Sequence, residues 1–202
     1  MKKIVLSLMT GVVLVACTAT DKKVETADTA AMGTAPSVTA STDAGSVAAT
    51  PAVTDPQIAA IVVAANDADI EGGRLAASKS TNAKVKEFAN RMITDHGGVN
   101  KAAVALVTKL GVKPEESAVS RQQTESGQQA RQTLRGKSGA EFDRAYIANE
   151  VTYHENLLGA IDKVLLPSAQ NGELKALLEQ TRPVVEAHLK LARELQPSLG
   201  QR

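Results

Sequence analysis

The chain has 202 residues, and its 23 lysines and arginines against 22 aspartates and glutamates give a formal net charge of +1 at pH 7. Without clustered basic residues, this balance excludes a protein that binds nucleic acid through a basic patch. With no tryptophan, two phenylalanines and two tyrosines, a core must be built from Ala, Leu, Val and Ile. Such a core favours close-packed helices over a sheet, so we expect an all-α fold.

The N-terminal segment is typical of a secretory signal peptide. Lys2 and Lys3 precede an apolar run over residues 4–16, which is shorter than the ~20 residues that cross a bilayer as a helix. The run ends in Leu-Val-Ala-Cys at residues 14–17, which resembles the bacterial lipobox. We therefore predict that residues 1–16 are a lipoprotein signal peptide.

Cys17, the only cysteine of the chain, is the predicted lipidation site. Lipidation would consume its thiol, so no disulfide is possible within the chain. Two or more acyl chains, palmitate among them, would anchor the protein stably in a membrane. Thr18 follows the cysteine in place of aspartate, and by resemblance to enterobacterial sorting this favours the outer membrane, facing the periplasm.

Residues 17–54 are rich in Ala, Thr, Ser, Asp, Val, Gly and Pro and carry no helical or strand periodicity. Such a segment buries too little apolar surface to offset the entropy of ordering it. We predict a disordered tether that spans about 35 Å as a flexible coil.

Four later segments carry apolar residues at helical spacing: 55–79, 82–110, 140–166 and 172–196. Asp55 is the expected N-cap of the first helix, with Pro56 at its first position. Gly111 is the expected C-cap of the second helix, and Pro167 should stop the third. Pro183 should kink the fourth helix, because it removes one backbone hydrogen bond. Gly72-Gly73, inside the first helix, indicates close approach to another helix.

The connection between the second and third helices, residues 112–139, is polar and too long to be structureless in a compact domain. Residues 119–135 fit a short polar helix that crosses the bundle. Ferritin-like bundles use such a long connection to bring the third helix back alongside the others. We therefore predict one domain over residues 55–197, a ferritin-like four-helix bundle.

The three histidines of the chain each fall on a different predicted helix, close to its apolar stripe. Glu71 on the first helix and Glu150, one turn before His154, are acids that we also expect to face inward. The candidate metal ligands are Glu71, His96, Glu150, His154 and His188. Further inward polar candidates are Asp95, Asp143 and Tyr146.

Carboxylates and imidazoles from facing helices suit iron, manganese or zinc. A di-iron bundle, however, carries Glu-x-x-His on two helices. Here Asp95 and His96 are adjacent, and Glu150 and His154 are four residues apart, which weakens the dinuclear case. Three interpretations stay open: histidines hydrogen-bonded within the core, a mononuclear metal site, and a dinuclear site.

A series of landmarks connects residues 55–196 with a known family. The landmarks are Glu71, Gly73, Leu75, Ala76, Lys79, Ser80, Asn82, Val85, Lys86, Phe88, Ala89, Met92, Asp95, His96, Asn100, Phe142, Asp143, Tyr146 and His154. In them the chain resembles the bacterial domain-of-unknown-function 4142 family, to which a ferritin-like helical bundle is assigned. The resemblance implies this fold and an envelope location but no activity. Its matching positions make Glu71, His96, Asp143 and His154 the best site candidates.

The sequence assigns no catalytic residue, because it shows no nucleophile motif and no phosphate-binding loop. We expect a lipid-anchored periplasmic protein without catalytic activity, acting in binding or envelope maintenance. The membrane is its expected partner through the lipid, and no protein partner or small ligand can be named. The alternative is a ferritin-like oxidoreductase or metal-storage protein that binds iron, manganese or zinc.

Overall fold

The computed structural model describes residues 53–200, and within this range every regular element is helical. Five helices have 18 residues or more: α1 (Asp55–Lys79), α2 (Ala83–Leu110), α3 (Ala118–Arg135), α4 (Gly139–Ala160) and α6 (Gly172–Leu195). Shorter elements are a π-helical turn (Ile161–Leu165), α5 (Leu166–Ser168) and a 3₁₀ turn (Gln196–Leu199). The expected all-α class is confirmed.

The predicted signal peptide, the lipidation site Cys17 and the predicted tether up to residue 52 lie outside the described residues. None of the described helices combines the length and the apolar character that crossing a bilayer requires.

The N-cap of α1 is Thr54, one residue earlier than predicted. The Thr54 hydroxyl accepts a hydrogen bond from the Gln57 amide, and the Gln57 side chain accepts one from the Thr54 amide. Asp55 has a different partner: its carboxylate accepts hydrogen bonds from the backbone amides of Gln170 and Asn171, both at 2.9 Å. The first turn of α1 is thereby fixed to the loop that precedes α6.

The ends of α2 agree with the sequence-based prediction. Asn82 accepts hydrogen bonds from the first amides of the helix, and Gly111 closes it with a left-handed φ of 64°. The chain of α4, by contrast, stays helical through the π turn and α5, so Pro167 lies in its last turn and does not stop it there. Helix α6 contains Pro183 in its interior and is helical on both sides of it.

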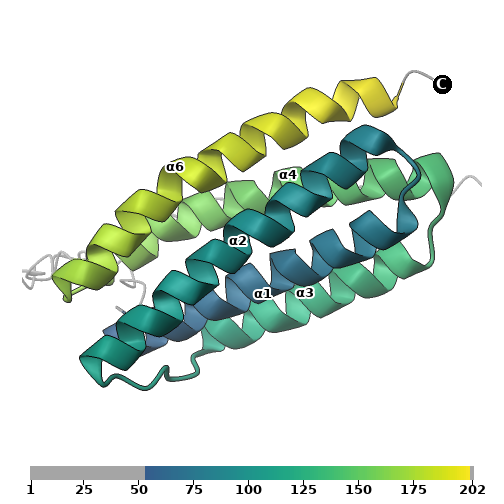
Figure 1. The fold of residues 1–202 in the computed structure, drawn as a ribbon. Coiled ribbons are helices and arrows are strands. Elements are labelled where there is room, and N and C mark those ends of the chain that lie inside the picture. Colours follow the sequence, from purple (N-terminus) through teal and green to yellow (C-terminus); the bar gives the residue numbers. More distant parts are fainter. Residues whose placement is uncertain (1–52, 201–202) are drawn as a thin grey trace, which may run out of the picture. The chain divides into compact units, whose positions relative to one another are not determined.

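Four of the long helices form a closed circuit of contacts, α1 with α2, α2 with α6, α6 with α4 and α4 with α1. In each of these four pairs the two helices run antiparallel to each other (Figure 1). The fifth long helix, α3, lies in the predicted polar connection and runs alongside α1 in the same direction (Figure 1). It thus returns the chain to the end of the fold where α2 began, so that α4 runs parallel to α2.

The interior consists of two apolar clusters that lie toward opposite ends of the helices. One includes Ile58, Ile61 and Leu178, and the other includes Met92 and Phe142. Between the two clusters lie buried polar residues of four helices, Asn66 and Asp69 on α1, His96 on α2, Glu150 and His154 on α4 and His188 on α6. The core therefore contains a polar layer at its middle.

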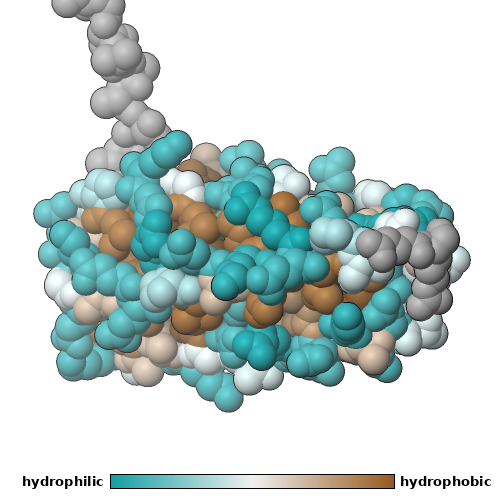
Figure 2. All heavy atoms as spheres, turned by 90° about the horizontal axis from the view of Figure 1, so that it is seen from above, coloured by the Kyte–Doolittle hydropathy of each residue, from teal (hydrophilic) through white to brown (hydrophobic). Residues whose placement is uncertain are grey.

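The apolar faces of the helices are largely turned into these clusters. On the face seen in Figure 2, hydrophilic side chains cover most of the surface, and hydrophobic ones show in rows between them. Among residues 53–200, Val104 is the one large hydrophobic residue that is mostly exposed.

Close packing at glycines brings two pairs of helices together. A Cβ atom on Gly73 would lie 2.9 Å from the backbone oxygen of Ala89, so α1 and α2 approach closely there. The predicted close approach at the glycine pair is confirmed for this residue. A Cβ on Gly127 would lie 2.6 Å from the Cβ of Ala68, so α3 is equally close to α1.

We predict that Gly73→Ala destabilises the fold by about 1–3 kcal/mol, because the backbone of α2 must move to admit the methyl group. Gly98→Ala is the matched control: Gly98 also lies inside a helix, but a Cβ there meets nothing within 4 Å. That change should stabilise the protein by up to about 1 kcal/mol, through helix propensity alone. Urea unfolding measures both effects, and equal stabilisation by the two substitutions would contradict the close contact.

Candidate metal centre

The polar layer contains imidazoles and carboxylates from four helices. They are Asp69 on α1, His96 on α2, Glu150 and His154 on α4 and His188 on α6, and none is more than 3% exposed. The three imidazole ring centroids lie 5.1 to 5.7 Å from one another. Side chains far apart in the sequence thus meet at one point, which we call the histidine cluster.

One nitrogen of each imidazole, the one facing away from the centre of the cluster, is held by a protein oxygen. The three pairs are His96 Nδ1 with Asn66 Oδ1 (2.7 Å), His154 Nδ1 with the Glu150 backbone oxygen (2.9 Å) and His188 Nε2 with Asp95 Oδ2 (2.9 Å). Because the partner is an oxygen acceptor in each case, the outer nitrogen donates and carries the hydrogen. The inner nitrogen is left with a free lone pair.

The inner atoms of the cluster have no hydrogen-bond partner. They are His96 Nε2, His154 Nε2, His188 Nδ1, both carboxylate oxygens of Asp69 and Glu150 Oε2. Asp69 Oδ2 nevertheless lies at ion-pair distance from two of them, 2.6 Å from His96 Nε2 and 3.4 Å from His154 Nε2. A buried polar atom without a hydrogen bond costs about 1–3 kcal/mol, so several of them in one place require an explanation.

The distances between these atoms fit a single metal ion. Donor nitrogens of the three histidines lie within 4.8 Å of one another, as do donor atoms of Asp69, Glu150 and His154. An ion bound tetrahedrally at about 2.0–2.2 Å from each ligand holds its donors about 3.4 Å apart. The donor atoms would therefore draw closer together around a bound ion, and His154, which belongs to both groups, would join them.

The environment favours the protonation states that metals bind. Burial would raise the pKa of Asp69, but the imidazoles of His96 and His154 outweigh it and lower this pKa to about 2. Burial lowers the pKa of His154 to about 4 and also lowers the pKa of His188. At neutral pH the cluster therefore offers an ionised Asp69 carboxylate and the neutral imidazoles of His154 and His188.

Glu150 differs from Asp69 in its charge state. Burial, and then the negative charge of Asp69, raises the pKa of Glu150 well above its ordinary value of 4.5. Without a cation, Glu150 thus keeps a proton beside Asp69, because two adjacent buried carboxylates cannot both ionise.

Two tyrosines border the cluster. The Tyr153 hydroxyl donates a 2.6 Å hydrogen bond to the backbone oxygen of Ala65, and its ring packs edge-on against His154. The Tyr146 hydroxyl is buried without a partner. Burial raises both tyrosine pKa values, so both hydroxyls stay protonated.

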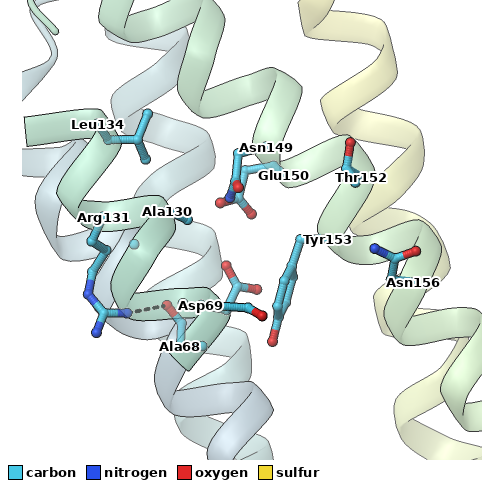
Figure 3. Close-up of a pocket in the computed structure, with 13 residues that line it drawn as sticks. Ala68, Asp69, Ala130, Arg131, Leu134, Asn149, Glu150, Thr152, Tyr153 and Asn156 are labelled. Carbon is cyan, nitrogen blue, oxygen red and sulfur yellow. Dashed lines mark hydrogen bonds between the residues drawn. The ribbon is translucent and has the colours of Figure 1, made fainter. Parts of the chain in front are cut away.

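A pocket of about 210 Å³ opens between α1, α3 and α4 and reaches Asp69 and Glu150. Figure 3 shows these two carboxylates extending into the same space, with the Tyr153 ring beside Asp69. The imidazoles of the histidine cluster do not line this pocket. The carboxylate side of the cluster is therefore the side that a small molecule can approach.

Comparison with protein families places the chain. The profile described as "Domain of unknown function (DUF4142)" matches residues 39–195. The chain belongs to the DUF4142 family. The resemblance drawn from the sequence is thus confirmed, although the match begins within the predicted tether. No curated protein and no solved structure matches the chain.

The resemblance to the DUF4142 family suggested two acids as site candidates, Glu71 and Asp143, and neither joins the histidine cluster. The prediction that Glu71 faces inward is wrong: its side chain is 49% exposed and pairs with Arg74 at 2.7 Å. Asp143 is buried with one unpartnered oxygen. It lies eleven residues before His154 on α4, which places it roughly 16 Å away along the helix. It lines a separate pocket beside Asn82.

Sequence reasoning missed Asp69 and Asn66, although a signal for both was available. The stripe of α1 runs through Val62 and Ala65 to Ala76, and steps of three or four residues pass through 66 and 69. Of the residues that were singled out, His96, Glu150, His154 and His188 lie in the cluster. Asp95 serves as the hydrogen-bond partner of His188, and Tyr146 belongs to the adjacent apolar cluster.

We predict that Glu150→Gln stabilises the metal-free protein increasingly as the pH rises. Above pH 4.5 the unfolded chain loses the Glu150 proton while the folded state keeps it, so wild-type stability falls with pH. Glutamine cannot ionise and avoids this loss. The stability difference should grow by up to roughly 1 kcal/mol per pH unit from pH 4.5 towards 8.

The measurement is urea unfolding of both proteins in the presence of a chelator at several pH values. A difference that stays constant across this range would mean that Glu150 ionises normally in the fold.

Proposed function

We propose that this protein binds one divalent transition-metal ion through His96, His154, His188 and Asp69, with Glu150 as a further ligand. The observation that carries the proposal is that buried polar atoms without a hydrogen bond converge from α1, α2, α4 and α6. In addition, each imidazole is oriented by a hydrogen bond at its outer nitrogen. Oriented imidazoles of this kind are characteristic of metal ligands.

The energetics favour a metal over histidines that merely pack in the core. Buried polar atoms without a partner cost about 1–3 kcal/mol each, and several of them meet in this cluster. A structural histidine would have both nitrogens satisfied, whereas the inner nitrogens of His154 and His188 have no hydrogen-bond partner. A bound cation would satisfy all the inner atoms at once.

A single ion fits the donors better than a pair. Two ions about 3.5–4 Å apart need bridging carboxylates and a second set of ligands. Only Asp69 and Glu150 supply inner carboxylates, since Asp95 is engaged with the outer nitrogen of His188. Imidazole and carboxylate ligands without sulfur suit iron, manganese or zinc.

The proposed fold is a ferritin-like four-helix bundle in which α3 is the long connection. Support comes from the antiparallel circuit of α1, α2, α4 and α6 and from the return of the chain through α3. Bundles of this kind hold metals with inward side chains from facing helices. A site for one ion per chain favours metal binding or metal-dependent redox chemistry over metal storage, because a storage protein must hold many ions.

We further propose that the protein is a lipoprotein anchored through Cys17, in the outer membrane and facing the periplasm. The support is the sequence: a charged start, a short apolar run and the Leu-Val-Ala-Cys ending at residue 17.

We predict that Asp69→Asn removes metal binding, while Glu71→Gln leaves it unchanged. Both substitutions replace an acid on α1 by its amide, but one side chain is buried in the cluster and the other is exposed. The affinity of the Asp69 variant should fall on the order of 100-fold or more.

The measurement is metal content and thermal unfolding of untagged protein with Mn²⁺ or Zn²⁺. At 100 times its dissociation constant a metal should add about 2.7 kcal/mol of stability to the wild type. Protein without metal and without this stabilisation would instead favour the non-catalytic binding module. Equal metal loss in the Glu71 variant would place the site elsewhere.

We predict that Cys17→Ser abolishes lipid labelling and releases the protein from the membrane fraction. The reason is that serine offers no thiol for acylation. Palmitate labelling and fractionation of cells that express each form measure the effect. A variant that still fractionates with membranes would show that the anchor lies elsewhere.

A further inference from the structure

We infer that the pocket between α1, α3 and α4 is a binding site for a small anion, which reaches the metal from the carboxylate side. The inference rests on the proposed metal site. A metal ion alone would account for the inner atoms of the histidine cluster but not for the open pocket beside Asp69 and Glu150.

The pocket has the right position and size. Its floor is formed by Asp69 and Glu150, and its walls come from α3 and α4 (Figure 3). Its volume of about 210 Å³ is well above the roughly 10–15 Å³ that one water molecule needs. A small ligand can therefore enter, while the three imidazoles occupy the opposite side of the ion.

Helix α3 determines the width of this pocket. Gly127 lets the helix approach Ala68 on α1, and Ala130 is a second small residue on the same wall. Arg131 holds α3 in place, since its Nη1 donates a 3.4 Å hydrogen bond to the backbone oxygen of Ala68 (Figure 3). A larger side chain at residue 130 would fill the space in front of the carboxylates.

The charges favour an anion. With Asp69 and Glu150 as ligands, the two positive charges of a divalent ion are balanced. Arg131 is the only cationic residue among those that line the pocket, and it forms no ion pair within residues 53–200. One positive charge therefore remains beside a partly enclosed site, where a monoanion would be attracted more strongly than in water.

The remaining polar lining is uncharged. Asn149, Thr152 and Asn156 contribute amides and a hydroxyl from α4, and these can donate hydrogen bonds to an anion. They do not add a negative charge that would repel it.

The test uses azide as the probe and the Co²⁺-loaded protein, whose visible absorption reports on ligands at the metal. The wild type should show a saturable spectral change with azide. Ala130→Phe should weaken azide binding at least tenfold and leave the Co²⁺ content unchanged. Ala102→Phe, the same substitution at an exposed position of α2, is the matched control and should bind azide as the wild type does.

A second variant tests the charge argument without filling the pocket. Arg131→Gln should weaken azide binding roughly threefold to tenfold, the effect of one partly exposed charge. Its Co²⁺ content should equal that of the wild type. This variant also decides the question if Ala130→Phe does not fold.

The outcomes separate the two proposals. If Co²⁺ does not bind the wild type, the metal site itself is wrong. If Co²⁺ binds but azide leaves its spectrum unchanged, the metal site stands and the anion site is overturned. Equal azide affinity in the wild type and Arg131→Gln, or in both folded phenylalanine variants, would likewise overturn the anion site.

Discussion

The interaction on which the structure depends is the meeting of three imidazole nitrogens with the Asp69 carboxylate in the interior of the helices. These atoms come from α1, α2, α4 and α6, and they find no hydrogen-bond partner in one another. A cation at their centre would join four helices through one set of bonds. Because each imidazole is already oriented from outside by Asn66, a backbone oxygen or Asp95, little further ordering would accompany binding.

The position of this layer also shapes the packing around it. Apolar clusters lie on either side of it along the helix axes, so each helix is anchored by hydrophobic contacts both before and after its polar residue. Close helix contacts at Gly73 and Gly127 bring α1 near its neighbours on both sides. Precise spacing of donor atoms follows from such contacts, because packed cores resist displacement.

Much of the fold was predictable because its signals are local. Asn82 and Gly111 mark the ends of α2 through their own capping chemistry, and the histidines follow the apolar stripes. The site acid was harder to predict, because Asp69 and Glu71 differ by two residues, or about 200° around a helix. Choosing between them requires the exact face of α1, which the close approach at Gly73 helps to fix. Helix α3 gave a weak signal, since only Ser120 and Leu134 are buried on it.

Asp55 gives the fold a mechanical property. Any tension along the N-terminal segment enters the helices at Thr54, and the next residue is bonded to the amides of Gln170 and Asn171. A pull on the chain would therefore be shared between α1 and the start of α6 from its first turn, instead of peeling α1 away alone. The two bonds lie at the end of the helices where the cluster with Ile58 and Leu178 lies. A force applied at this end would therefore act on these bonds and on that cluster before it reached the polar layer.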